Sequence, residues 1–225
     1  MKLPIAREGF VFIKICLSLT LIFLIIGQSY RHKILLGFSV IFLLLLLFVI
    51  FFFRDPERKI DAAKNLVISP GDGRVLEITE EQNIFVGKAK VVKIFLSVFN
   101  VHIQRSPVAG RVAFIQYNEG KFLPANCPKA SLENEQNWIG IENKEGKVLV
   151  KQIAGLIARR IACWVKMGED VDQGRRIGLI RFGSQVDLYF PVSWDVQVKV
   201  GQKVKAGVTV IGAIGRTKVE KEVFQ

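Results

Sequence analysis

The sequence predicts a mainly β domain preceded by a helical hairpin that is apolar enough to lie in a membrane. Two long apolar runs occupy residues 10–27 and 34–53. From Leu66 onward the chain changes to short β-branched runs punctuated by glycine, which is typical of β-sandwiches and barrels. Hydrophobic residues make up 50% of the 225-residue chain, a high share for a purely soluble protein. We therefore expect a membrane hairpin over residues 1–53 and one β-rich domain over residues 54–225.

The composition favours a membrane surface over nucleic acid as the partner. The net charge is +12, from 32 basic and 20 acidic residues, and a basic protein can bind either kind of polyanion. No RNA-binding signature, zinc-finger spacing or basic heptad region occurs, so we expect no nucleic-acid partner. The cysteines Cys16, Cys127 and Cys163 are isolated, and the only histidines are His32 and His102. We therefore expect no metal site and reduced thiols.

Each apolar run is close to the roughly 20 residues that a helix needs to cross a bilayer core of about 30 Å. The polar residues 28–33 form a tight connection between the runs. Basic residues gather near their other ends: Lys2, Arg7, Lys14, Arg54, Arg58, Lys59 and Lys64. The connection holds only Arg31 and Lys33, so the positive-inside rule places both termini and the β-rich domain on the cytoplasmic face of the cell membrane. The alternative is a hairpin that lies in the interface without crossing.

The β-rich part carries strand-like runs at short intervals. They cover residues 66–69, 73–78, 89–95, 110–116, 137–143, 147–153, 161–165, 175–182, 185–190, 197–200 and 208–213. Helical periodicity is hard to find in this part of the chain, and residues 155–159 are interpreted as a turn. The pattern predicts an all-β sandwich or barrel.

An internal repeat sharpens this prediction. Gly168, Val171 and Gly174 are spaced as Gly201, Val204 and Gly207 are, and each set precedes an apolar strand. The unit resembles the hairpin repeats of biotinyl/lipoyl-type β-folds, which often pair about a pseudo-twofold axis. The lysine that would carry a biotinyl or lipoyl group is absent, so only the architecture is expected to carry over.

Two polar segments of the β-rich part are candidates for chemistry. Asp72 lies in Ser69-Pro70-Gly71-Asp72-Gly73, which is typical of a tight turn that could hold a carboxylate to orient a base or bind a cation. His102 is the only histidine after the apolar runs, so any histidine acid–base role there falls to it. Arg105 follows closely and could pair with a carboxylate or phosphate of a substrate. The structural alternatives are a hairpin turn and a histidine bonded to the backbone.

The pair Gly183-Ser184 precedes residues that alternate Val186, Leu188 and Phe190 with polar or aromatic neighbours. A loop therefore enters a strand at this pair. No Gly-x-Ser-x-Gly elbow surrounds Ser184, which disfavours an ordinary serine hydrolase. Another possibility is attack by the Ser184 hydroxyl on the carbonyl of Gly183, where the missing side chain removes an obstruction. The resulting ester would be cleaved by elimination, and the new terminus would hydrolyse to a pyruvoyl group, an electron sink for decarboxylation.

Taken together, four motifs resemble the phosphatidylserine decarboxylase family in its short bacterial and archaeal form. They occur in the expected order: Phe52-Phe53-Arg54-Asp55-Pro56-Glu57-Arg58, Ser69-Pro70-Gly71-Asp72-Gly73, Phe95-Leu96-Ser97 through Asn100-Val101-His102 to Arg105-Ser106-Pro107, and Arg181-Phe182-Gly183-Ser184. They span most of the chain. The long form has a second histidine where this chain has Arg105, and Leu-Gly where it has Phe182-Gly183.

The resemblance implies self-cleavage between Gly183 and Ser184 and then decarboxylation of phosphatidylserine, or a close anionic relative, to phosphatidylethanolamine in phospholipid biosynthesis. A large membrane-bound chain, residues 1–183, would stay with a small chain, residues 184–225, and a higher oligomer is possible. Ser184 would become the pyruvoyl cofactor that forms a Schiff base with the substrate. The resemblance also implies that Asp72 and His102 assist self-processing or decarboxylation.

Two other functions are compatible with parts of the sequence. A membrane-tethered, lipoyl-like adaptor module accounts for the hairpin and the glycine repeat, but it gives no role to Ser184, Asp72 or His102. A serine hydrolase that uses Ser184 and His102 would keep the serine intact. The state of residue 184 therefore separates the three functions.

Overall fold

The computed structural model describes residues 4–60, 63, 65–121, 133–155, 160–181 and 184–215. It divides the chain into two compact units, Met1–Glu57 and Arg58–Gln225. Each unit is described by itself below. Cys127, Phe182 and Gly183, which the sequence analysis singled out, lie outside the described residues.

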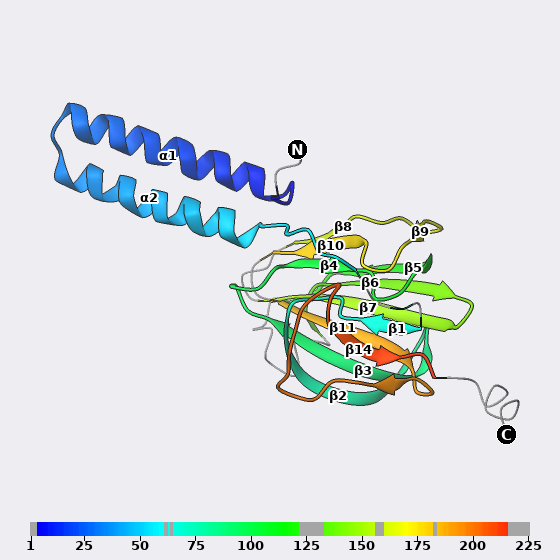
Figure 1. The fold of residues 1–225 in the computed structure, drawn as a ribbon. Coiled ribbons are helices and arrows are strands. Elements are labelled where there is room, and N and C mark those ends of the chain that lie inside the picture. The colour runs from blue at the N-terminus through cyan, green and yellow to red at the C-terminus, as the bar shows by residue number, and fades with distance from the viewer. Residues whose placement is uncertain are drawn as a thin grey trace, which may run out of the picture. The chain divides into compact units, whose positions relative to one another are not determined.

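The first unit is an antiparallel pair of helices, α1 (Gly9–Ser29) and α2 (Lys33–Phe52) (Figure 1). Each is long and apolar enough to cross a membrane. The connection is tight because Arg31 adopts a left-handed conformation with φ of 51°. The rings of Phe23 and Phe42 stack with their centroids 5.4 Å apart, which joins the two helices. Both apolar runs are thus confirmed as helices.

The second unit is mainly β, as predicted, and its strands pair in antiparallel fashion. In the described part of the chain they form an eight-stranded sheet in the order β13-β2-β3-β11-β7-β6-β5-β9 and two three-stranded sheets, β1-β14-β12 and β4-β10-β8 (Figure 1). The strands are β1 (Leu66–Ile68), β2 (Gly73–Asn83), β3 (Gly87–Leu96), β4 (Ile103–Arg105), β5 (Gly110–Asn118), β6 (Gln136–Asn143), β7 (Gly146–Ala154), β8 (Ile161–Cys163), β9 (Asp170–Val171), β10 (Arg176–Ile180), β11 (Ser184–Pro191), β12 (Asp195–Val196), β13 (Lys203–Val204) and β14 (Val210–Ala213).

The strand orders reveal an internal pseudo-twofold relation. One half consists of β1 to β3 and β11 to β14, and the other consists of β4 to β10. In the strand orders, β1, β2 and β3 correspond to β4, β5 and β6, and β11 to β14 correspond to β7 to β10 in sequence. The two halves meet where β11 pairs with β7. The predicted glycine repeat belongs to this relation, because β9 and β13 follow Gly168 and Gly201 as two-residue strands. The closer likeness to biotinyl/lipoyl-type folds stays a prediction.

Each half contains one copy of a Ser-Pro-x-x-Gly-Arg-Val turn, at residues 69–75 and 106–112. The Ser69 hydroxyl donates to the carbonyl of Gly71 at 2.7 Å, and the Ser106 hydroxyl donates to that of Val108 at 2.6 Å. The residue before each copy is also hydrogen-bonded to the proline of the other copy. Ile68 N donates to Pro107 O, and Arg105 N donates to Pro70 O.

Two turns, at Gly174 and Gly207, are hydrogen-bonded to these two copies; we call them the glycine turns. Gly207 N donates to Ser69 O and Gly174 N donates to Ser106 O, both from a left-handed backbone with φ of 75° and 80°. A Cβ on either glycine would lie within 3 Å of Ile60 Cδ1, so one side chain packs against both turns. Glycine is therefore needed for the backbone conformation and for the close packing.

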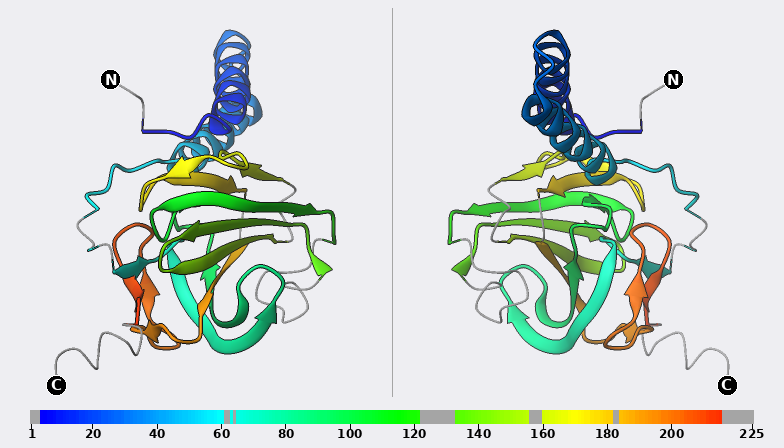
Figure 2. Two further views of the ribbon diagram at one scale, coloured as in Figure 1. Left: turned by 90° about the vertical axis from the view of Figure 1, so that its right-hand side faces the viewer. Right: turned by 90° about the vertical axis from the view of Figure 1, so that its left-hand side faces the viewer.

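The eight-stranded sheet curls because β2 and β3 bend strongly (Figure 2). Phe85, at the tip of the β2–β3 hairpin, reaches across to β5, where its ring stacks on Phe114 with the centroids 5.4 Å apart. Buried aliphatic side chains such as Ile94, Val150 and Leu188 form the main core on the other face of the sheet. Both faces of the central strands are consequently buried.

Two details of the predicted strands were wrong. The strand expected at residues 197–200 lies instead at Asp195–Val196, because the chain turns at Lys199, whose carbonyl accepts a bond from Gln202 N. The two-residue strands β9 and β13 and the three-residue strand β4 were not predicted, since runs this short show no periodicity.

Candidate active site

Ser184 is the first residue of β11, a central strand of the eight-stranded sheet. It pairs with Leu96 of β3 on one side and with Ala154 of β7 on the other. The residue is fully buried, and its Oγ has no hydrogen-bond partner among the described residues. An unsatisfied buried hydroxyl is uncommon in proteins and costs free energy, so it needs an explanation.

The periodicity of β11 directs Ser184 toward the main core. Val186, Leu188 and Phe190 lie on the same face of the strand as Ser184 and belong to the apolar core. The hydroxyl therefore lies at the edge of an apolar environment, away from bulk water. Gly183, its expected partner in cleavage, lies outside the described residues.

His102 lies in the segment that leads into β4 and is fully buried. Its Nδ1 is 3.0 Å from the carbonyl oxygen of Asn100. Since a carbonyl only accepts hydrogen bonds, we assign the proton to Nδ1, which leaves Nε2 as the basic nitrogen of the neutral ring. The His102 carbonyl accepts a bond of 3.2 Å from Ile180 N, at the end of β10. The histidine segment is thereby bonded to the strand that precedes the expected cleavage site.

A chain of buried amides supports the histidine segment. Gln104 Nε2 donates to the His102 carbonyl at 2.8 Å, Gln152 Nε2 donates to Gln104 Oε1 at 2.8 Å, and Asn137 Nδ2 donates to Gln152 Oε1 at 2.8 Å. The three amides come from β4, β7 and β6 and are at most 3% exposed. A satisfied buried network of this kind fixes the relative position of its strands.

Asp72 lies in the first Ser-Pro-x-x-Gly-Arg-Val turn and is 8% exposed. Its carboxylate accepts two hydrogen bonds from the guanidinium of Arg58, at 2.6 and 2.8 Å. The backbone N–H of Ala206 donates to the same carboxylate at 2.8 Å. The tight turn predicted around Asp72 is present, and Arg58 is a partner that the sequence analysis did not identify.

Arg105 is 5% exposed and lies at the end of β4. Its Nη1 donates to the carbonyl of Gly174 at 3.0 Å, and its side chain also lies beside Gly207. The guanidinium therefore contacts both glycine turns. The substrate contact that the sequence analysis predicted for Arg105 stays a prediction.

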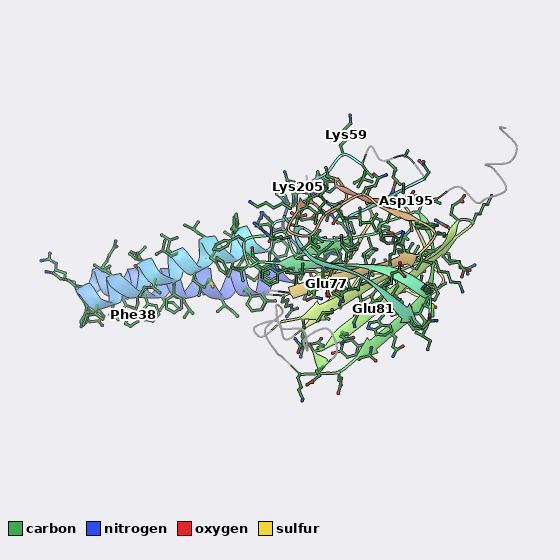
Figure 3. All side chains as sticks on the ribbon, turned by 90° about the horizontal axis from the view of Figure 1, so that it is seen from below. Phe38, Lys59, Glu77, Glu81, Asp195 and Lys205 are labelled. Atoms are coloured by element: carbon green, nitrogen blue, oxygen red, sulfur yellow. The ribbon has the colours of Figure 1, made fainter. Side chains whose placement is uncertain are left out.

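The opposite face of β11 carries a row of charges that is buried at Asp187 and Lys151 and reaches solvent at Glu77. Glu77, Lys93, Asp187 and Lys151 are neighbours across β2, β3, β11 and β7. Lys93 Nζ lies 2.9 Å from Glu77 Oε2 and 3.1 Å from Glu81 Oε1. Both glutamates belong to β2 (Figure 3). Although burial alone would lower the pKa of Lys93, these contacts raise it overall.

Asp187 is the most deeply buried member of this row. Its Oδ1 accepts a hydrogen bond of 2.7 Å from Gln185, while Oδ2 has no hydrogen-bond partner within the described ranges. Burial raises the pKa of Asp187 from 3.8 to about 6, and Lys151 and Lys93 only partly oppose the rise. Burial also lowers the pKa of Lys151. Asp187 and Lys151 are therefore the poorly hydrated members of the row.

Within the described residues, no group of three or more His, Cys, Asp and Glu side chains could hold a metal ion. Cys16 and Cys163 are free thiols. The described structure thus brings Ser184, His102 and Asp72 onto strands and turns of one domain. Sequence reasoning missed Arg58, Gln104, Gln152 and Asn137; the Ser-Pro-x-x-Gly-Arg-Val repeat was a visible but unused signal for the turn that Arg58 holds.

Comparison with known proteins gives a consistent result. The family model described as phosphatidylserine decarboxylase matches residues 45–212. A phosphatidylserine decarboxylase proenzyme of Desulfotalea psychrophila is 44% identical over 216 residues, which cover 95% of this chain and 98% of the relative. Proenzymes of the same name from Burkholderia cenocepacia and Burkholderia vietnamiensis are each 44% identical over 212 residues, or 93% of this chain and 96% of the relative.

Proposed function

Because the chain belongs to the phosphatidylserine decarboxylase family, we propose that it cleaves itself between Gly183 and Ser184 and then decarboxylates phosphatidylserine to phosphatidylethanolamine. The observation that carries the proposal is the buried Oγ of Ser184, which has no hydrogen-bond partner among the described residues. A structural serine at the start of a central strand would be expected to bond its surroundings. A nucleophile, in contrast, must attack the preceding carbonyl with its hydroxyl, so it need not hydrogen-bond its surroundings.

Self-cleavage would proceed through the residues themselves. Ser184 Oγ attacks the carbonyl carbon of Gly183 and displaces the Ser184 nitrogen, so that the amide becomes an ester. Removal of a proton from Ser184 Cα then expels the Gly183 carboxylate and leaves a dehydroalanine terminus. Water replaces its nitrogen, which leaves as ammonia, and residue 184 becomes a pyruvoyl group. The word proenzyme in the relatives' names supports such a processing step.

The site fits a pyruvoyl group because the residue that supplies its atoms is fully buried at the edge of the core. When formed, the group supplies a carbonyl that condenses with the substrate amine and accepts the electrons released by loss of CO₂. The chain's own contribution is to exclude water around residue 184 and to place acid–base groups nearby.

His102 is the proposed proton carrier. The bond to Asn100 fixes its tautomer, and the amide chain that begins at Gln104 fixes its backbone. A neutral Nε2 can take a proton from the hydroxyl or from Cα of Ser184, or return one during decarboxylation. Asp72 is proposed to assist the same steps, and Arg105 stays a candidate for contact with the anionic part of the substrate.

The proposal includes a membrane location. The apolar helices α1 and α2 support membrane association, and the basic residues at their outer ends favour a β-rich domain on the cytoplasmic face. After cleavage, a large chain of residues 1–183 and a small chain of residues 184–225 would remain together. Ser184 lies in a strand that pairs with β3 and β7 of the large chain, which supports a stable two-chain enzyme.

The decisive measurement is the intact mass of the purified protein under denaturing conditions. We expect two chains. The large chain ends at Gly183, and the small chain begins at residue 184, which the pyruvoyl group blocks. Ser184→Ala should remain one 225-residue chain without decarboxylase activity, whereas Gln185→Ala, on the other face of β11, should still cleave. An intact wild-type chain would contradict the proposal and favour the adaptor function. His102→Ala should slow cleavage, decarboxylation or both by at least about 100-fold, the usual scale of acid–base catalysis.

A further inference from the structure

Three residues, Arg58, Asp72 and Ala206, form a compact contact that we call the staple. The Arg58 guanidinium forms a two-pronged ion pair with Asp72 and also donates to the Ala206 carbonyl. The Ala206 N–H completes the contact by donating to Asp72. The side chains of Arg58 and Asp72 are each 11% exposed, so solvent screens this pair less than a surface pair.

The staple fixes the loop that carries Asp72. Within this loop, a Cβ placed on Gly71 would lie 3.6 Å from Leu96 Cδ1 and 3.7 Å from Val186 Cβ. Leu96 is the cross-strand partner of Ser184, and Val186 is two residues beyond it. The loop therefore packs against the strands on either side of the Ser184 backbone.

The same loop contacts the segment that carries the histidine. The carbonyl of Pro70 accepts a hydrogen bond of 2.9 Å from Arg105 N, three residues after His102. A shift of the loop would consequently disturb both the strands beside Ser184 and the segment that carries His102. Arg58 itself makes no contact with Ser184 that the structure describes, so any effect on the chemistry must pass through its partners Asp72 and Ala206.

The second half of the domain shows that the turn does not need a staple to form. There Ala109 occupies the position of Asp72 and is exposed, yet the Ser106 hydroxyl and Gly174 N make the same contacts as Ser69 and Gly207. The ion pair is therefore an addition to a turn that is already complete. We therefore look for the role of the ion pair at Ser184, which belongs to the first half.

We propose that Arg58 is a positioning residue for the chemistry at Ser184, acting through Asp72 to hold the loop of residues 69–73 against β3 and β11. This inference rests on the proposed function. After cleavage, Arg58 and Asp72 belong to the large chain and Ala206 to the small chain, so the staple also joins the two chains. Arg58 thereby connects the segment that follows α2 to the small chain.

A double-mutant cycle on the full-length protein tests the staple. Arg58→Gln, Asp72→Asn and the double variant are synthesised in a cell-free system with lipid nanodiscs, and cleavage is followed on denaturing gels. We expect each single variant to slow cleavage by about 10-fold, the scale of a lost coupling between neighbouring charged residues. The double variant should be no slower than the slower single one, because both substitutions remove the same contact.

Two further variants complete the test. Arg58→Lys keeps the charge without the two-pronged geometry and should cleave at a rate between wild type and Arg58→Gln. Arg175→Gln removes the surface ion pair with Glu169 beside the second turn and should cleave like wild type. Once cleaved, Arg58→Gln should show a lower kcat with an unchanged KM, since the staple is not expected to bind lipid.

The outcomes separate the staple from the proposed function. Wild-type cleavage by Arg58→Gln, no recovery with Arg58→Lys, or a double variant as slow as the product of the two singles would each overturn the staple while leaving self-cleavage intact. A wild-type chain that is not cleaved at Ser184 would overturn both. If Asp72→Asn abolishes cleavage while Arg58→Gln cleaves like wild type, Asp72 acts without the help of Arg58, which also contradicts the inference.

Discussion

The two halves of the β-rich domain share a scaffold and differ at the candidate active site. In the second half, β6 and β7 are joined by a short hairpin that closes at the pair Asn143 and Gly146. At the corresponding place in the first half, β3 ends and β11 begins at the pair Leu96 and Ser184, which come from distant parts of the chain. The difference teaches that the proposed nucleophile lies where the internal repeat is interrupted.

The turn of each half shows the same contrast. Asp72 and its partner Arg58 are buried in the first turn, whereas Ala109 of the second turn borders an open cavity of about 450 Å³. Its lining includes Lys144 and Glu145 of the β6–β7 hairpin. Residues that the halves share therefore build the turns, and residues that differ are the candidates for function. Four predictions test this division, from the largest expected effect to the smallest.

Alanine at the shared glycine of either turn should have the largest effect. A Cβ on Gly73 would lie 2.0 Å from the Phe95 carbonyl oxygen, and one on Gly110 would lie 2.5 Å from that of Glu142. Both obstacles are backbone atoms, so we expect Gly73→Ala and Gly110→Ala each to lower the free energy of unfolding by about 3 kcal/mol or more. Urea unfolding of the detergent-solubilised chain measures the loss. If only one variant is destabilised, the two glycines are not equivalent.

The second prediction concerns the boundary between the halves, where Asp187 of β11 pairs with Lys151 of β7. Burial raises the pKa of Asp187 from 3.8 to about 6. Between these pH values the folded state keeps a proton that the unfolded state has lost, so stability falls as the pH rises from about 4 to 6. The shift corresponds to about 3 kcal/mol, which remains lost at higher pH.

Asp187→Asn should remove this pH dependence. We expect urea midpoints of the wild-type chain to fall between pH 4 and pH 7 by more than those of the variant. Asp195→Asn changes an exposed carboxylate of β12 (Figure 3) and should keep the wild-type slope. An unchanged slope in Asp187→Asn would show that Asp187 keeps an ordinary pKa in the folded state.

The architecture was largely predictable because it rests on patterns that a sequence displays. The apolar runs gave the two helices, and the spacing of Gly168, Gly174, Gly201 and Gly207 revealed the repeat. The burial of Asp187 was not predictable. Alternation along β11 marks it as opposite to the core, but the curled sheet buries both faces, and period-two patterning carries no information about curl.

The site was predictable only in part, for a related reason. Ser184, His102 and Asp72 stood out as unusual residue types in tight motifs. The residues that support them did not stand out in the sequence. Gln104, Gln152 and Asn137 resemble ordinary surface amides until the strands are placed side by side. Arg58 was one of several basic residues after the second apolar run, and only the fold selects it as the partner of Asp72.

The third prediction compares the two turn serines, which make the same hydrogen bond. Ser69→Ala and Ser106→Ala each remove a buried hydroxyl bonded to the carbonyl two residues ahead. Each should cost about 1 kcal/mol of stability, the net value of one such bond. Cleavage should slow only in Ser69→Ala, because that turn carries Asp72. Equal slowing in both variants, measured on denaturing gels, would show that cleavage responds to stability alone.

The smallest effect is expected when the second turn is given the acid of the first. Ala109 is exposed, and the described residues place no arginine beside it as Arg58 lies beside Asp72, so Ala109→Asp should change stability by less than about 0.5 kcal/mol. The cleavage rate should also be unchanged, since Ser184 pairs with Leu96 and Ala154, at the other end of β7 from the hairpin beside Ala109. The same reasoning applies in an Asp72→Ala background, where an aspartate at position 109 should restore nothing. Recovery of cleavage in that double variant would mean that either half can serve Ser184, and the division between shared scaffold and unshared function would have to be abandoned.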